Sequence, residues 1–176
     1  MKIGGVEVNG PSEEILVLTR MDSEDIVIKA VAVPDMDEFN KLCPEPKPRG
    51  IRTKKEGYKL DYDDPNYKKQ KDHYNELHTA YIVLKSLEPS EIEWSRVKMD
   101  QPSTWLEWQK ELKETGFSIF EVNRIVMTVM SANALDEGKL EKAREVFLLG
   151  RAQELGKSCG PQEELQTTPS GDLVNG

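Results

Sequence analysis

The stretch CPEPKPRG places prolines at alternate positions, Pro44, Pro46 and Pro48. A proline lacks a backbone N–H and fixes φ, so neither an α-helix nor the interior of a β-ladder can run through this stretch. The stretch must therefore separate the structure that precedes it from the structure that follows it. The two sides also differ in pattern, because short apolar runs precede the prolines and long runs with helical spacing follow them.

The residues before the prolines predict a small antiparallel β-meander. Three runs rich in apolar and β-branched residues are separated by turn-forming residues, at 2–8, 14–19 and 25–33. In the third run, alternation places four apolar residues on one face, namely Ile26, Ile28, Ala30 and Ala32. A short helix is expected at 34–42, because acidic residues crowd its first turn. A sheet this small is marginal alone, so we expect it to pack on another element.

The residues after the prolines predict four helices. The first starts with Asp64 as N-cap and Pro65 as first helical residue, and it carries an apolar seam of Tyr67, Tyr74, Leu77, Tyr81 and Leu84. The second is expected at 102–114, capped by Ser103 or Thr104 and stopped by Gly116. The residues 91–97 between them are expected to form a short extended piece.

The third helix is expected to open with a capping box made by Ser118 and Glu121. Its apolar residues nearly encircle it, which predicts the central core helix, and they are Ile119, Phe120, Val122, Ile125, Val126, Met127, Val129 and Met130. A fourth helix, 136–149, is expected to turn Leu140, Ala143 and Phe147 toward that core. The remaining residues are small and polar, which favours a disordered C-terminal tail.

The predicted fold class is therefore α+β, with a small N-terminal antiparallel β-meander followed by a four-helix, mainly α-helical domain and a disordered tail. The expected parts are a meander with a short helix, a proline-rich basic linker, a helical domain and a flexible polar tail, at 1–42, 43–63, 64–150 and 151–176. A chain of 176 residues is sufficient for one main core.

The net charge of −8 is unevenly distributed. Residues 43–71 hold 9 basic and 5 acidic groups, and the segments on both sides are acidic. The overall charge argues against nonspecific DNA binding, and the basic strip is most simply a solvated linker. The two cysteines lie in the linker and the tail, which fits a reduced chain. No apolar run is long enough for a membrane span or a signal peptide, so we expect a cytoplasmic protein.

No sequence motif indicates catalysis, a cofactor or a metal. The only histidines, His73 and His78, are five residues apart and point in different directions on a helix. The acidic residues around Asp63 resemble a calcium loop only superficially, because Pro65 and Asn66 occupy the positions that form its turn. Phosphate-binding loops, CxxC pairs and nucleophile motifs are absent from the sequence, so we expect a non-enzymatic protein without a cofactor.

The candidate partner-binding residues are therefore aromatic or basic. Trp105 and Trp108 share a helix face, and the core interpretation of this pair competes with a docking interpretation. The other candidates are two tyrosines of the long helix and four cations of the linker, namely Tyr74, Tyr81, Arg49, Arg52, Lys54 and Lys55.

Several segments in order resemble one family. They are VLTR, DMDEFNKLCPEPKPRG, AYIVLKSLEPSEIEW, PSTWLEWQKEL and GFSIFEVNRIV. Together these segments, within roughly residues 1–150, look like tail assembly chaperones of tailed bacteriophages. The resemblance implies a non-enzymatic protein of the infected bacterial cell, which binds the tape-measure and tail-tube proteins during tail building and is absent from the finished particle. Self-association is a further expectation.

Two alternative function classes remain open at this stage. A structural virion component, such as a tail or head-to-tail connector protein, would be present in purified particles. A small nucleic-acid-binding regulator would use residues 47–71, and its affinity would fall steeply with salt.

The resemblance also suggests a test at the level of translation. In many such families a ribosomal slip near the end of the reading frame gives a longer product, and Leu155-Gly156-Lys157 can be encoded as CTG GGA AAG, which contains a slippery heptamer. Expression of the gene with its native downstream DNA should give a minor, longer product that diverges near Gly156, detectable by intact-mass spectrometry. A single product of 176 residues would contradict this expectation.

Overall fold

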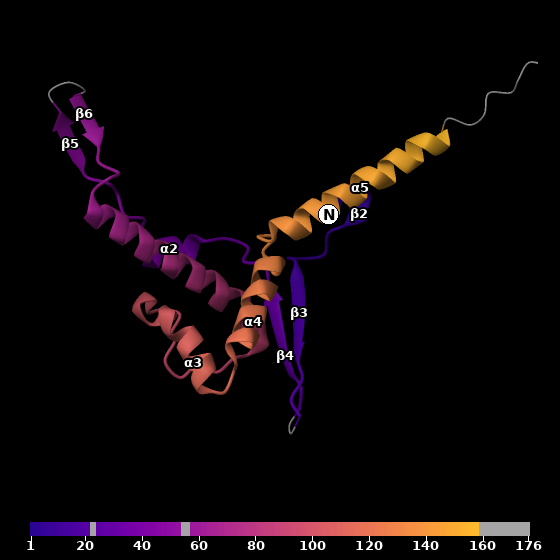
Figure 1. Cartoon of the computed structure of the whole chain (residues 1–176), viewed down its shortest axis with the longest axis horizontal. Helices are drawn as coiled ribbons and strands as arrows, with labels where there is room; N and C mark the ends of the chain where they lie inside the picture. Colours follow the sequence, from indigo (N-terminus) through magenta and orange to yellow (C-terminus); the bar gives the residue numbers. More distant parts are fainter. Residues whose placement is uncertain (22–23, 54–56, 159–176) are drawn as a thin grey trace, which may run out of the picture. The chain divides into compact units, whose positions relative to one another are not determined.

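The fold is α+β in the computed structural model, which describes residues 1–21, 24–53 and 57–158. The chain forms two compact units, Met1–Glu137 and Gly138–Gly176. All described strands and the helices up to α4 belong to the first unit (Figure 1). This division differs from the expected one, because the segments 1–42 and 64–132 contribute to one common core.

The N-terminal strands form two separate hairpins and not one three-stranded meander. Strands β1 (Lys2–Ile3) and β2 (Val6–Glu7) pair with each other, and β3 (Glu13–Leu18) pairs antiparallel with β4 (Ile26–Val31). The predicted first strand is interrupted because Gly4 and Gly5 have φ values of 58° and 85°, which reverse the chain within it. The meander prediction therefore has the correct strand regions but the wrong pairing.

The β3–β4 hairpin packs through one face, as the alternation predicts. Leu18, Ile28 and Ala30 are buried on this face. Helix α4 (Ile119–Ala132) lies along the hairpin (Figure 1). Two polar contacts join them, because the Ser131 hydroxyl donates to Glu14 at 3.1 Å and Arg20 pairs with Glu121 at 2.7 Å.

The expected linker 43–63 contains a third hairpin. Its strands are β5 (Gly50–Thr53) and β6 (Gly57–Leu60), and Gly57 supplies the positive φ at the start of the returning strand. The preceding helix α1 (Asp37–Leu42) ends before the three prolines. The sequence analysis did not predict this hairpin, because its strands are short and their charged residues obscure the alternation of apolar and polar side chains.

The main helices begin where the sequence predicts. Helix α2 (Pro65–Ser86) is capped by Asp64, which accepts the Asn66 N–H at 2.9 Å, and Ser118 and Glu121 form the predicted capping box of α4. The second helical segment is a 3₁₀ helix, η2 (Pro102–Glu107), that continues into α3 (Trp108–Glu114). Neither Ser103 nor Thr104 caps it; the Thr104 hydroxyl accepts the Lys98 N–H instead.

A second 3₁₀ helix, η1 (Glu88–Ser90), follows α2, and residues 91–97 form no strand. Ser90 takes the place of a strand beside β4, because its Oγ accepts the Lys29 N–H at 2.8 Å and donates to the Lys29 carbonyl at 2.7 Å. The backbone groups of Lys29, on the edge of β4 that faces away from β3, are thus satisfied by one hydroxyl.

Helix α5 (Glu137–Ser158) is longer than predicted, so residues 151–158 of the expected tail are helical. The segment has no proline, and single glycines are tolerated inside a helix. The rest of the predicted tail, 159–176, lies outside the described residues. Leu140, Ala143 and Phe147, which were expected to face the core, belong to the second unit and are exposed on α5. The run Val146–Leu149 distributes apolar residues around the helix at 100° each, so it forms no single core-facing side.

Asn133, at the end of α4, joins three elements of the first unit. Its Oδ1 accepts the Val33 N–H at 2.8 Å, and its Nδ2 donates to the Ser86 hydroxyl and the Val129 carbonyl, both at 2.8 Å. Ser86 is fully buried. The amide therefore satisfies polar groups of α2, α4 and the chain after β4 where water has little access.

The substitution Asn133→Ala should lower the free energy of unfolding by about 2 to 3 kcal/mol, because it leaves buried polar groups without partners. Asn123→Ala, on the exposed side of the same helix, is the matched control and should change it by less than about 0.5 kcal/mol. Urea denaturation followed by circular dichroism measures both. Equal stabilities for the two variants would contradict the role given to Asn133.

Candidate protein-binding surfaces

The aromatic residues predicted as partner contacts lie mostly in the core. Trp105 and Tyr81 are fully buried, and their ring centroids lie 5.3 Å apart. Phe39 of α1 contacts both rings and also lies 5.3 Å from Tyr74, which is half-buried. Of the two interpretations of these residues, the structure supports the core one for Trp105 and Tyr81.

The Tyr81 hydroxyl has its hydrogen-bond partner within the fold. It donates to Glu38 Oε2 at 3.1 Å. Burial, together with the hydrogen bond and charge of Glu38, raises the pKa of Tyr81 to about 12. The indole Nε1 of Trp105 likewise donates to the Lys98 carbonyl at 3.0 Å. Both polar groups are thus used within the fold.

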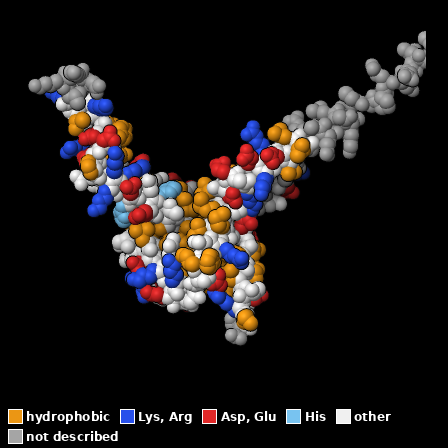
Figure 2. Space-filling view, viewed as in Figure 1, with side chains coloured by type: hydrophobic (Ala, Val, Ile, Leu, Met, Phe, Trp, Pro, Cys, Tyr) orange, Lys and Arg blue, Asp and Glu red, His pale blue; other side chains and the backbone are white. Residues whose placement is uncertain are grey.

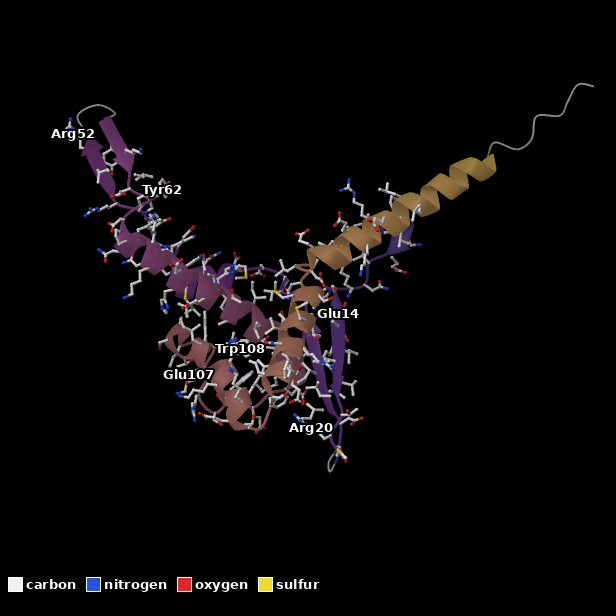
Figure 3. All side chains as sticks on the ribbon, viewed as in Figure 1. Glu14, Arg20, Arg52, Tyr62, Glu107 and Trp108 are labelled. Carbon is white, nitrogen blue, oxygen red and sulfur yellow. The ribbon has the colours of Figure 1, made fainter. Side chains whose placement is uncertain are left out.

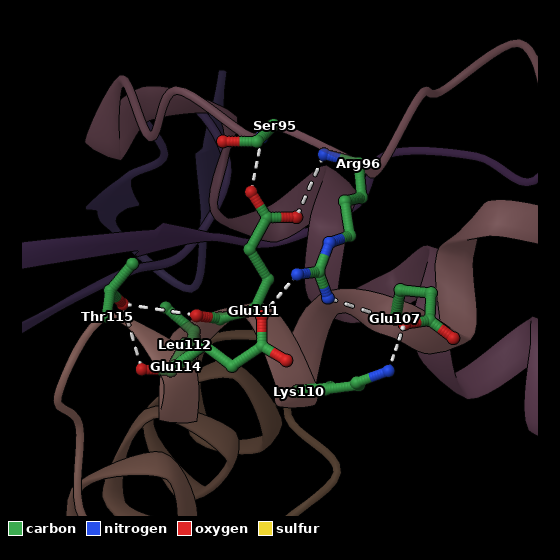
Figure 4. Close-up of polar contacts among 8 residues, drawn as sticks. All are labelled: Ser95, Arg96, Glu107, Lys110, Glu111, Leu112, Glu114 and Thr115. Atoms are coloured by element: carbon green, nitrogen blue, oxygen red, sulfur yellow. Dashed lines mark hydrogen bonds and ion pairs between the residues drawn. The ribbon is translucent and has the colours of Figure 1, made fainter.

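Glu111 of α3 is a buried carboxylate with a structural role (Figure 4). Its two oxygens accept the backbone N–H groups of Ser95 and Arg96. Burial would raise the pKa of Glu111, but the hydrogen bonds from this backbone outweigh burial and lower it. The Arg96 side chain pairs with Glu107 and Glu114 on the same helical segment. This network ties the loop after η1 to the helix that carries Trp108.

Trp108 is one of the residues that line an open cleft. The cleft has a volume of about 670 Å³ and lies between α2 and the η2–α3 segment. Its α2 side is lined by Asp72, Asn75, Glu76, Thr79 and Ala80, and its other side by Leu106, Trp108 and Gln109. Trp108 itself is buried, and the Leu106 side chain is exposed. Figure 3 shows Trp108 pointing between these helices. Among the described residues that line this cleft, two are carboxylates and none is basic.

The basic candidates lie at the β5–β6 hairpin. Arg49 pairs with Asp61 at 3.9 Å and with Asp64 at 3.2 Å, which ties the hairpin base to the start of α2. Arg52 lies on the hairpin and makes no ion pair with a described residue (Figure 3). Lys54 and Lys55 lie outside the described residues. Arg49 is therefore engaged within the fold, whereas Arg52 is directed to solvent.

Helix α4 has a second, exposed apolar side that the sequence analysis did not predict. Val122, Ile125 and Val129 form its buried stripe. The side away from this stripe carries Ile119, Phe120 and Met127, with exposed fractions of 48%, 77% and 58%, and the half-buried Val126 and Met130 continue it. We call these five residues the α4 face. Figure 2 shows hydrophobic side chains gathered over α4.

The outer face of the β3–β4 hairpin is also apolar. Ile15, Val17 and Val27 are exposed there, and Val17 lies directly opposite Val27. Scattered exposed apolar residues are normal on proteins, but contiguous ones mark contact sites. The sequence did show that apolar residues nearly encircle α4, but this pattern predicted a fully buried helix. Periodicity does not reveal which sides of a helix have neighbours.

No family model, no curated protein and no solved structure matches this chain. Among the described residues, no helix is long and apolar enough to cross a membrane. The described part of the chain also contains no cluster of histidine, cysteine and acidic residues that could hold a metal ion. His73 Nδ1 lies 3.7 Å from Glu76, and His78 packs against Phe39 with ring centroids 5.2 Å apart.

The lowered pKa of Glu111 makes stability depend on pH. A carboxylate whose pKa is lower in the folded state stabilises the fold above its unfolded value, about 4.5, and this contribution is lost as the pH falls through the folded pKa. Urea unfolding from about pH 7 to about pH 3 should therefore show a smaller loss of stability on acidification in Glu111→Gln than in the parent chain.

Glu7→Gln, which removes an exposed carboxylate, serves as the control and should keep the pH dependence of the parent chain. Glu111→Gln should also be less stable at neutral pH, because charged acceptors form the stronger hydrogen bonds. Parallel stability curves for the parent and Glu111→Gln would show that Glu111 does not carry this linkage.

Proposed function

We propose that this chain is a tail assembly chaperone of a tailed bacteriophage, which acts without catalysis in the host cytoplasm. It holds an apolar segment of the tape-measure protein, and it contacts the tail-tube protein, until these parts assemble. The observation that carries the proposal is the α4 face. The family assignment itself rests on the sequence resemblance.

The α4 face fits this role because its helix is otherwise well fixed. The capping box closes its start, Asn133 closes its end, and its opposite side is buried against the core. The helix backbone that carries the apolar side chains is therefore already ordered before a partner arrives, which reduces the entropy lost on binding. Phe120 is the most exposed of them and is the expected anchor.

The size of the face suits a helical or extended apolar segment. Ile119, Val126 and Met130 lie in one row along α4 together with Asn123, and Phe120 and Met127 lie in the next row together with Arg124. Two rows of this kind form ridges, and apolar side chains of a partner helix can pack into the groove between them. Methionine adapts to side chains of different shape, which suits a protein that holds a long and varied partner.

Phe120→Glu and Met127→Glu should each weaken capture of the tape-measure protein encoded by the same phage by at least about thirtyfold, which corresponds to about 2 kcal/mol for an apolar anchor. Co-expression followed by affinity capture and calorimetry measures this loss. Thr128→Glu, on another side of the same helix, should bind like the parent chain. The Phe120→Glu and Met127→Glu variants should keep the parent unfolding midpoint, because the replaced side chains are exposed.

Two results would contradict the proposal. Unchanged binding in both glutamate variants would exclude the α4 face as the contact. Detection of the chain in many copies in purified particles, by mass spectrometry, would favour the structural virion component over a chaperone.

A further inference from the structure

The β5–β6 hairpin presents a face that no described element covers. Because directly opposed residues share a face, Arg52 and Tyr58 lie together, as do Gly50 and Leu60. Tyr58 is 75% exposed and Leu60 is exposed beside it. We call these four residues the Tyr58 face. It combines two apolar side chains with one cation.

The Tyr58 face has a defined shape. The ring of Tyr58 lies on Gly50, since a Cβ atom at position 50 would meet the Tyr58 hydroxyl oxygen at 1.8 Å and its ring carbon Cζ at 2.1 Å. The glycine thus provides room for the aromatic ring across the hairpin. At the base, Arg49 pairs with Asp61 and Asp64, so the hairpin is attached to the first residues of α2.

A two-stranded hairpin of this size is marginal alone in water. Burial of Tyr58 and Leu60 would stabilise it, and that burial requires a surface with an apolar floor and negative charge. The cleft between α2 and η2–α3 has this composition, because Leu106 and Trp108 line it on the η2–α3 side and Asp72 and Glu76 line it on the α2 side.

We infer that the Tyr58 face of one copy of this chain docks into the α2/η2 cleft of a second copy. Tyr58 and Leu60 cover Leu106 and Trp108, and the Arg52 guanidinium pairs with Asp72 or Glu76. The cation Arg52 on the hairpin and the carboxylates Asp72 and Glu76 of the cleft have opposite charges. This complementarity favours a second copy as the partner and determines how the two copies are oriented.

This contact is heterologous, because the two surfaces that meet are different. In a pair, the copy that contributes its hairpin retains a free cleft, and the copy that contributes its cleft retains a free hairpin. Copies of the chain therefore add head to tail, to give a ring or an open row. The inference concerns contacts among copies and does not depend on the tape-measure partner or on the α4 face.

The test uses two variants of the full chain that block opposite surfaces. Arg52→Glu with Tyr58→Ala changes only the hairpin, and Asp72→Lys with Glu76→Lys changes only the cleft. Sedimentation velocity should show assemblies of the parent chain that grow with concentration, whereas each variant alone should remain monomeric. Each variant should weaken the contact by at least about tenfold.

An equimolar mixture of the two variants is the decisive sample. The intact cleft of the hairpin variant and the intact hairpin of the cleft variant should form one contact, so the mixture should give a dimer and nothing larger. Exposed charges elsewhere supply the controls, and Lys41→Glu and Asp100→Lys should assemble like the parent chain. Circular dichroism should show equal folding in all samples.

Three outcomes would overturn the inference. The first is a parent chain that stays monomeric at every concentration, which would mean that the hairpin contacts its own chain or a nucleic acid and not a second copy. The second is an assembly that both variants leave unchanged. The third is a mixture that remains monomeric although the parent chain assembles. Assembly should also weaken at high salt, because an exposed ion pair is screened there.

Discussion

The burial of Phe39 is the contact on which the first unit depends. Phe39 belongs to α1, before the three prolines, yet its ring packs among Tyr74, Tyr81 and Trp105 from helices after them. Fully burying such a side chain contributes about 2 to 3 kcal/mol, and it holds α1 against α2 and η2. The prolines therefore interrupt the secondary structure without separating two cores.

The same arrangement explains why α4 has two different apolar sides. The β3–β4 hairpin and α2 cover the side with Val122, Ile125 and Val129. The first unit offers no further described element for the side with Phe120 and Met127. Exposed apolar side chains that lie next to one another are uncommon on a soluble surface, which is why the proposed partner contact is placed on this side.

The sequence indicated several parts of the structure correctly because they depend on local interactions. The N-cap Asp64, the capping box of Ser118 and the stop at Gly116 involve residues no more than three positions apart. The apolar seam of α2 was also predicted, since its spacing requires only the helical period. The first hairpin and the β5–β6 hairpin were missed, because glycine conformation and short charged strands leave a weak pattern.

The sequence by itself determined the α+β class, the helix starts and the interruption at the prolines, because these follow from backbone chemistry over a few residues. The tertiary structure alone decided which aromatic residues are buried and which surfaces remain open. Trp105 and Phe120 have similar apolar character in the sequence, but Trp105 packs against Phe39 of α1 and Tyr81 of α2, whereas Phe120 is exposed to solvent. Burial depends on contacts between residues distant in the chain, and no local pattern contains that information.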